Sequence, residues 1–152
     1  MLRGNSMRIG IVGERRYLAQ EMPSAVARAF EARGIGVDVI CPHAIQFYPD
    51  VGVVHGEGGR EYALNHYDVI VSRTRNALGL AILAFAEVAG IPAINTHAAT
   101  QRVRNKAKMA IRLHQAGIHC APTVLASDAG ALADLTDHWF PLILKATYGD
   151  PR

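Results

Sequence analysis

Long apolar runs are missing from this sequence of 152 residues. A helix that crosses a bilayer needs ~20 consecutive apolar residues. The most apolar stretch, residues 77–94, contains Glu87 and is interrupted by Gly90 and Pro92. The first residues also lack the apolar segment of a secretory signal. We therefore expect no membrane association and a cytoplasmic protein, whose two cysteines, Cys41 and Cys120, are reduced.

Several catalytic and metal-binding motifs are also missing. The seven histidines form no H-E-x-x-H pair, and neither cysteine has a partner at C-x-x-C spacing, so the sequence predicts no structural zinc. No G-x-S-x-G segment is present, which disfavours a hydrolase triad. The first glycine turn reads "GIVGERR" (10–16) rather than G-x-G-x-x-G, and no acidic residue ends the second expected strand. A dinucleotide site is therefore only weakly indicated.

Lysine is scarce, because only three of the 16 basic residues are lysines: Lys106, Lys108 and Lys145. The formal net charge is +3 and the pI is about 9.1. One dense basic run, residues 102–108, lies in a helical pattern without the interleaved aromatic residues of a nucleic-acid surface. A solvated protein surface accounts for this charge, and we expect no nucleic-acid partner.

What the sequence does contain is an alternation of short apolar runs and helical patterns. Strands are expected at 8–13, 37–42, 67–73 and 91–95, and helices at 24–34 and 77–90. Residues 43–66 are less regular and fit a small hairpin or a long loop. Apolar strands joined by helices predict an α/β fold with a Rossmann-like parallel sheet over residues 7–95.

The pattern changes after residue 95. Residues 96–117 predict one long helix or two short ones, with Thr96 as N-cap and Gly117 just past the end. A strand at 121–126, a helix at 127–137 and a strand at 140–146 are expected to follow. This arrangement is typical of the opening of a second domain.

A set of short motifs in this second part resembles a known family. They are "NK" at 105–106, "AGI" at 116–118, "PT" at 122–123 and "FPLILKATYG" at 140–149. In this order they resemble the N-terminal portion of ATP-grasp carboxylate–amine ligases, in the group of the ribosomal-protein glutamate ligase and the lysine-biosynthesis carrier-protein ligase. The resemblance implies a pre-ATP-grasp domain at 7–95, a linking helix at 96–118 and the incomplete start of the ATP-grasp domain at 119–152.

The resemblance also implies an activity. ATP would phosphorylate a substrate carboxylate, and an amine would attack the acyl phosphate. Lys106 and Lys145 would hold the nucleotide, and the loop with Tyr148 and Gly149 would cover its phosphates. The family's Mg²⁺ ligands would lie outside this chain, so the 152 residues alone are expected to be inactive. For both lysines an ordinary solvated position is the alternative.

Arg73 ends the expected strand 67–73, at the edge where open α/β sheets bind ligands. Its guanidinium could form a fork with a substrate carboxylate, and Arg15 and Arg16 have the same placement after the first strand. The alternative is a solvated loop arginine.

The substrate stays open at this stage: an amino acid, a peptide or a carrier protein are all compatible with the sequence. The analogy with the family suggests a homodimer. A stand-alone α/β binding or regulatory module without catalysis is the competing hypothesis for the whole chain.

Overall fold

A four-stranded parallel sheet forms the centre of the first part of the chain. The computed structural model describes residues 7–147, and its sheet has the order β2-β1-β6-β7. The strands are β1 (Arg8–Gly13), β2 (Gly36–Ile40), β6 (Val69–Arg73) and β7 (Ala93–Ile94), and every pairing is parallel. The predicted α/β fold with a parallel sheet is confirmed.

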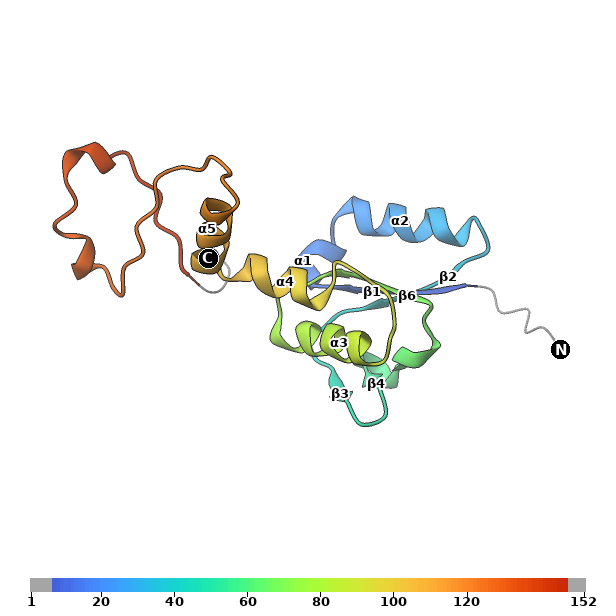
Figure 1. The fold of residues 1–152 in the computed structure, drawn as a ribbon. Coiled ribbons are helices and arrows are strands. Elements are labelled where there is room, and N and C mark those ends of the chain that lie inside the picture. Colours follow the sequence, from blue (N-terminus) through green and yellow to red (C-terminus); the bar gives the residue numbers. More distant parts are fainter. Residues whose placement is uncertain (1–6, 148–152) are drawn as a thin grey trace. The chain divides into compact units, whose positions relative to one another are not determined.

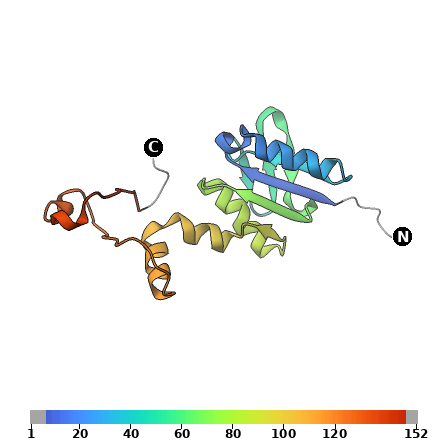
Figure 2. The ribbon, with the colours of Figure 1, turned by 90° about the horizontal axis from the view of Figure 1, so that it is seen from above.

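Helices cover both faces of this sheet. Helices α1 (Arg15–Leu18) and α2 (Glu21–Glu31) lie on one face, and α3 (Ala77–Val88) lies on the other (Figures 1 and 2). The sequence predicted α2 and α3 within a few residues of their ends, but it gave no sign of the single-turn α1. Gly90 has a φ of 71°, which suits a glycine just past the end of α3.

The irregular stretch 43–66 folds into a second, antiparallel sheet. It consists of β3 (Gln46–Tyr48), β4 (Val53–His55) and β5 (Glu61–Ala63), with 3₁₀ turns η1 (Glu57–Gly59) and η2 (Leu64–His66) beside them. The rings of Phe47 and Phe85 meet edge to face with centroids 5.9 Å apart, which joins β3 to α3. This explains why the sequence of α3 is apolar almost all round, since it packs against residues of both sheets.

One apolar cluster unites these elements. Its members come from the two sheets, η2 and α3, and eight of them have no exposed surface: Val12, Ile40, Val54, Leu64, Ile70, Ile82, Leu83 and Ala86. The strands of the parallel sheet therefore contribute Val and Ile to the core, as expected for strands covered on both faces.

The chain divides into two compact units, Met1–Gln101 and Arg102–Arg152. The segment 96–117 forms two helices, α4 (His97–Arg104) and α5 (Lys106–Gln115). They are separated by Asn105, whose φ of −91° and ψ of 102° are extended. The Thr96 hydroxyl accepts the backbone N–H of Ala99 at 3.2 Å, and Gly117 has a φ of 66° after α5, as predicted for both residues.

Three predicted elements of the second unit are wrong. Residues 121–126 and 140–146 are not strands, and residues 127–137 contain no α-helix but the 3₁₀ turn η3 (Gly130–Leu132), followed by η4 (Asp137–Trp139). A strand exists only as part of a ladder, and no described residue pairs with either segment. The apolar pattern that predicted the strands instead leaves Ile143 and Leu144 80% and 70% exposed.

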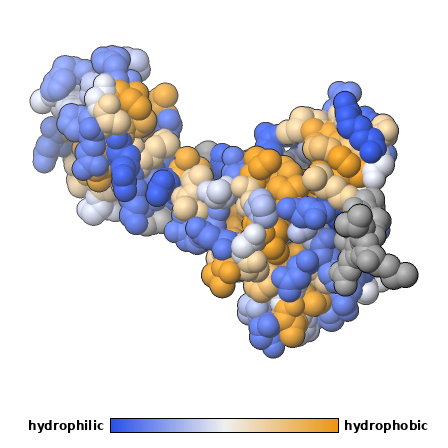
Figure 3. Space-filling view, turned by 45° about the vertical axis from the view of Figure 1, so that its right-hand side comes forward, coloured by the Kyte–Doolittle hydropathy of each residue, from blue (hydrophilic) through white to orange (hydrophobic). Residues whose placement is uncertain are grey.

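Apolar side chains reach the surface in both units (Figure 3). In the second unit the large exposed ones are Val103, Met109, Ile111, Ile118, Val124, Leu125, Phe140, Ile143 and Leu144. Within residues 7–147, no helix has the length and apolar character required to cross a bilayer.

Candidate functional site

The carboxyl ends of β1 and β6 meet at the centre of the parallel sheet. Gly13 and Arg73 are direct partners in the ladder. The chain leaves β1 toward β2 through α1 and α2, and leaves β6 toward β7 through α3 on the other face. Such a reversal of direction is the point at which open α/β sheets bind ligands. The structure therefore places Arg73 where the sequence predicted it, at this edge.

Buried Glu14 ties the two strand ends together. Its carboxylate accepts the backbone N–H of Arg75 and forms an ion pair with Arg16, with Nε and Oε2 3.3 Å apart. A carboxylate is costly to bury unless it is paired and hydrogen-bonded, and both conditions are met here. This role of Glu14 was not predicted, although a single acidic residue directly after a buried strand was a visible signal.

Arg73 differs from its cationic neighbours at this edge. Arg15 pairs with Glu57 at 2.8 Å, and Arg16 pairs with Glu14. The guanidinium carbon of Arg73 lies 4.5 Å from the centre of the Tyr17 ring, a cation–π contact. Among residues 7–147, no carboxylate forms an ion pair with Arg73. Its charge is therefore available to an anion.

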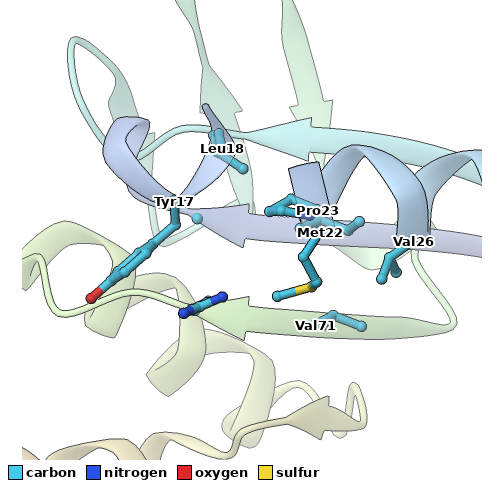
Figure 4. A pocket seen from close by; sticks show the side chains of 9 residues that line it. Tyr17, Leu18, Met22, Pro23, Val26 and Val71 are labelled. Carbon is cyan, nitrogen blue, oxygen red and sulfur yellow. The ribbon is translucent and has the colours of Figure 1, made fainter. Parts of the chain in front are cut away.

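An apolar pocket lies beside Arg73. Its volume is about 90 Å³. The residues that line it come from β1, β6, α1 and α2 and are Ile11, Gly13, Tyr17, Leu18, Met22, Pro23, Val26, Val71 and Arg73. Met22 and Val26 reach from α2 toward the strand that carries Val71 (Figure 4). The Tyr17 hydroxyl points away from Met22 and Val26 in this view. The pocket thus has apolar walls, and Arg73 contributes only apolar atoms to them.

Side-chain amides hold the end of β6 in place. Asn76 caps α3 by accepting the N–H of Leu78 at 2.7 Å, and Asn95 Nδ2 donates to the Ser72 carbonyl at 2.9 Å. Asn95 follows β7, so two neighbouring strands are linked at their carboxyl ends. These contacts fix the backbone that carries Arg73.

Lys106 and Lys145 belong to segments that meet inside the second unit. The backbone N–H of Lys106 donates to the carbonyl oxygen of Thr147 at 3.0 Å. Asn105, which is only 6% exposed, caps α5 by accepting the N–H of Lys108 at 2.9 Å. The first turn of α5 therefore lies against the chain just after Lys145. The side chain of Lys145 is exposed, and Tyr148 and Gly149 lie outside the described residues.

Metal ligands are not grouped in residues 7–147. No three His, Cys, Asp or Glu side chains there come close enough together to hold a metal ion.

Comparison with known proteins gives one kind of match. The sequence matches no protein-family model and no curated protein. The fold is similar to the crystal structure of a RimK domain protein, ATP-grasp, from Sphaerobacter thermophilus DSM 20745, with a TM-score of 0.68 and 19% identity. The match covers 95% of this chain and 52% of that one, so the chain spans about half the length of the solved structure. At this identity the likeness establishes the shared fold.

Proposed function

We propose that this chain is the N-terminal part of an ATP-dependent carboxylate–amine ligase of the ATP-grasp type. The observation that carries the proposal is the hydrogen bond from Lys106 N–H to the Thr147 carbonyl. It brings together the two lysine-bearing segments to which the motif resemblance assigns the nucleotide. The shared fold with an ATP-grasp protein supports the same conclusion.

In this proposal, the second unit binds the nucleotide. Lys106 and Lys145 would neutralise phosphate charge, which increases on the transferring group during phosphoryl transfer. Tyr148 and Gly149 would belong to the loop over the phosphates. Bound ATP would supply a phosphoryl group to a substrate carboxylate, and an amine would then displace phosphate to form the C–N bond.

The substrate carboxylate is assigned to Arg73. A guanidinium offers two parallel N–H donors to a carboxylate, which orients it as well as binding it. Any Mg²⁺ would take its ligands from outside this chain, as the motif resemblance implies. The substrate remains an amino acid, a peptide or a carrier protein.

Calorimetric titration with ATP and Mg²⁺ tests the proposal. It should be run on this chain and on the product of the complete reading frame that contains it. We expect binding at least in the latter, and a loss of roughly tenfold or more in affinity for Lys145→Ala, since one charge-assisted contact contributes about 1.5–3 kcal/mol.

Lys108→Ala is the matched control, because Lys108 is an exposed lysine on the same helix as Lys106. An equal loss for Lys108→Ala and Lys145→Ala would indicate general charge attraction and argue against the assigned roles. Absence of ATP binding in both proteins would overturn the proposal and favour the α/β binding module.

A further inference from the structure

We propose that the pocket between α1–α2 and the strands β1 and β6 binds the aliphatic part of a ligand whose carboxylate pairs with Arg73. The ligand class is a small carboxylic acid with an apolar tail. Its identification as the ligase substrate rests on the proposed function, whereas the binding site itself rests only on the geometry below.

The size and walls of the pocket define the tail. Its volume of about 90 Å³ is below that of the ~150 Å³ apolar cavities that admit benzene, so it suits an aliphatic group of a few carbons. The side chains of Ile11, Leu18, Val26 and Val71 offer no hydrogen-bond partner to a polar group. A polar or charged tail would lose its water there without compensation.

The charge pattern defines the head group. Arg15 and Arg16 already have carboxylate partners, whereas the exposed Arg73, whose apolar atoms line the pocket, has none among residues 7–147. A single guanidinium matches a monocarboxylate, whereas a phosphate group with two negative charges is usually held by several donors.

The contact with Tyr17 leaves the required donors available. The guanidinium carbon of Arg73 lies 4.5 Å from the centre of the Tyr17 ring, a cation–π contact. A guanidinium carries five N–H donors, which is more than one ring contact can occupy. Tyr17 thereby holds Arg73 in place while a carboxylate binds at its edge.

Three small probes separate the contributions of the carboxylate and of the aliphatic tail to the binding affinity. They are titrated into the whole chain without nucleotide, and binding is measured by NMR chemical shifts or calorimetry. The probes are 4-methylpentanoate, acetate and 4-methylpentanamide. Each buried methylene should tighten binding about fourfold, so the longer acid should bind roughly tenfold or more tightly than acetate. The amide, which lacks the charge, should bind more weakly than the acid of the same shape.

Variants locate the site. Arg73→Gln should remove the preference for the acid over the amide, and Val26→Phe should remove the preference for the longer acid by filling the pocket. Met22→Phe is a second filling variant at a position that is 49% exposed, so it disturbs folding less. Arg28→Gln is the matched control, because it removes a charge from an exposed position of α2 that does not line the pocket.

Equal affinity for acetate and 4-methylpentanoate would overturn the assignment, as would unchanged binding in Arg73→Gln. Failure here is distinguishable from failure of the ligase proposal, which is measured by ATP binding. The expected acid series together with an absence of ATP binding would establish the pocket and reject the ligase. ATP binding that depends on Lys145, without any acid binding, would reject the pocket alone.

Discussion

Gly79, in the first turn of α3, shows how a single methyl group can decide local packing. A Cβ at this position would lie 2.6 Å from Cγ2 and 2.9 Å from Cβ of Thr74, which is only 4% exposed and has little room to move. Gly79→Ala should therefore lower the free energy of unfolding by about 1–3 kcal/mol, despite the better helix propensity of alanine.

Urea denaturation of Gly79→Ala measures this loss. Gly36→Ala is the control, since the nearest atom to its Cβ would be at an ordinary 3.5 Å. If both variants were as stable as the parent, close packing of Thr74 on α3 would be disproved.

Tyr67 makes stability depend on pH in the alkaline range. Its hydroxyl donates to Asp38 Oδ2 at 3.1 Å, and Asp38 also pairs with Arg8 at 2.7 Å. Burial, and next the negative charge of Asp38, raise the pKa of Tyr67 well above its usual value of about 10. The unfolded chain therefore releases this proton at a lower pH than the folded one, and stability should fall as pH rises above about 10.

Urea unfolding of the parent chain and of Tyr67→Phe between about pH 8 and 11 isolates this effect. The variant should show a weaker decline, whereas Tyr48→Phe, at a position that is 42% exposed, should follow the parent. Parallel curves for the parent and Tyr67→Phe would contradict the assignment.

At the scale of elements, the start of α3 depends on one side chain. The Asn76 amide oxygen accepts the N–H groups of Leu78 and Gly79 at 2.7 and 3.4 Å. Asn76→Ala should reduce the free energy of unfolding by about 1 kcal/mol, while Asn76→Asp should retain most of it because aspartate caps equally well.

Thermal and urea unfolding would quantify the cap, with Asn65→Ala as an exposed asparagine control in η2. A loss for Asn76→Asp as large as that for Asn76→Ala would show that the cap is not the cause.

At the scale of the whole molecule, the two units differ in how much they bury. The first unit contains the apolar cluster, whereas Asn105 is the one buried residue of the second unit within its described part, 102–147. Amide hydrogen exchange should therefore be slowest in β1 and β6. It should be faster by several orders of magnitude at 121–126, where no ladder protects the backbone.

Exchange followed by mass spectrometry resolves these segments. Protection of 121–126 equal to that of β1 would show a strand ladder in solution and restore the strand that the sequence predicted there. Helix α5 serves as an internal reference within the second unit, because its helical hydrogen bonds should slow amide exchange relative to the neighbouring segments.

The parallel sheet could be predicted from the sequence because its signals are local. "RIGIVG" and "YDVIVSR" are short β-branched runs that can be buried on both faces, and Gly34 and Gly90 end helices by their backbone freedom. The three-stranded sheet of 46–63 was left open, since strands of three residues carry too little pattern to distinguish them from a loop. The strands expected at 121–126 and 140–146 failed because a ladder requires a partner, which an apolar run cannot specify.

For the site, the sequence by itself determined that Arg73 ends a parallel strand and that Lys106 lies in a helical segment, whereas the break between α4 and α5 at Asn105 came from the structure. Only the tertiary structure decided which arginine keeps an available charge. Arg15 pairs with Glu57, which comes from elsewhere along the chain, and Arg16 pairs with Glu14 of the same turn. The pocket likewise arises where α1 and α2 pack across β1 and β6. The spacing of Tyr17, Met22 and Val71 in the sequence does not predict it. The position of Arg73 at a strand end follows from the local sequence, whereas the Arg15–Glu57 pair and the shape of the pocket depend on contacts between residues distant in the chain.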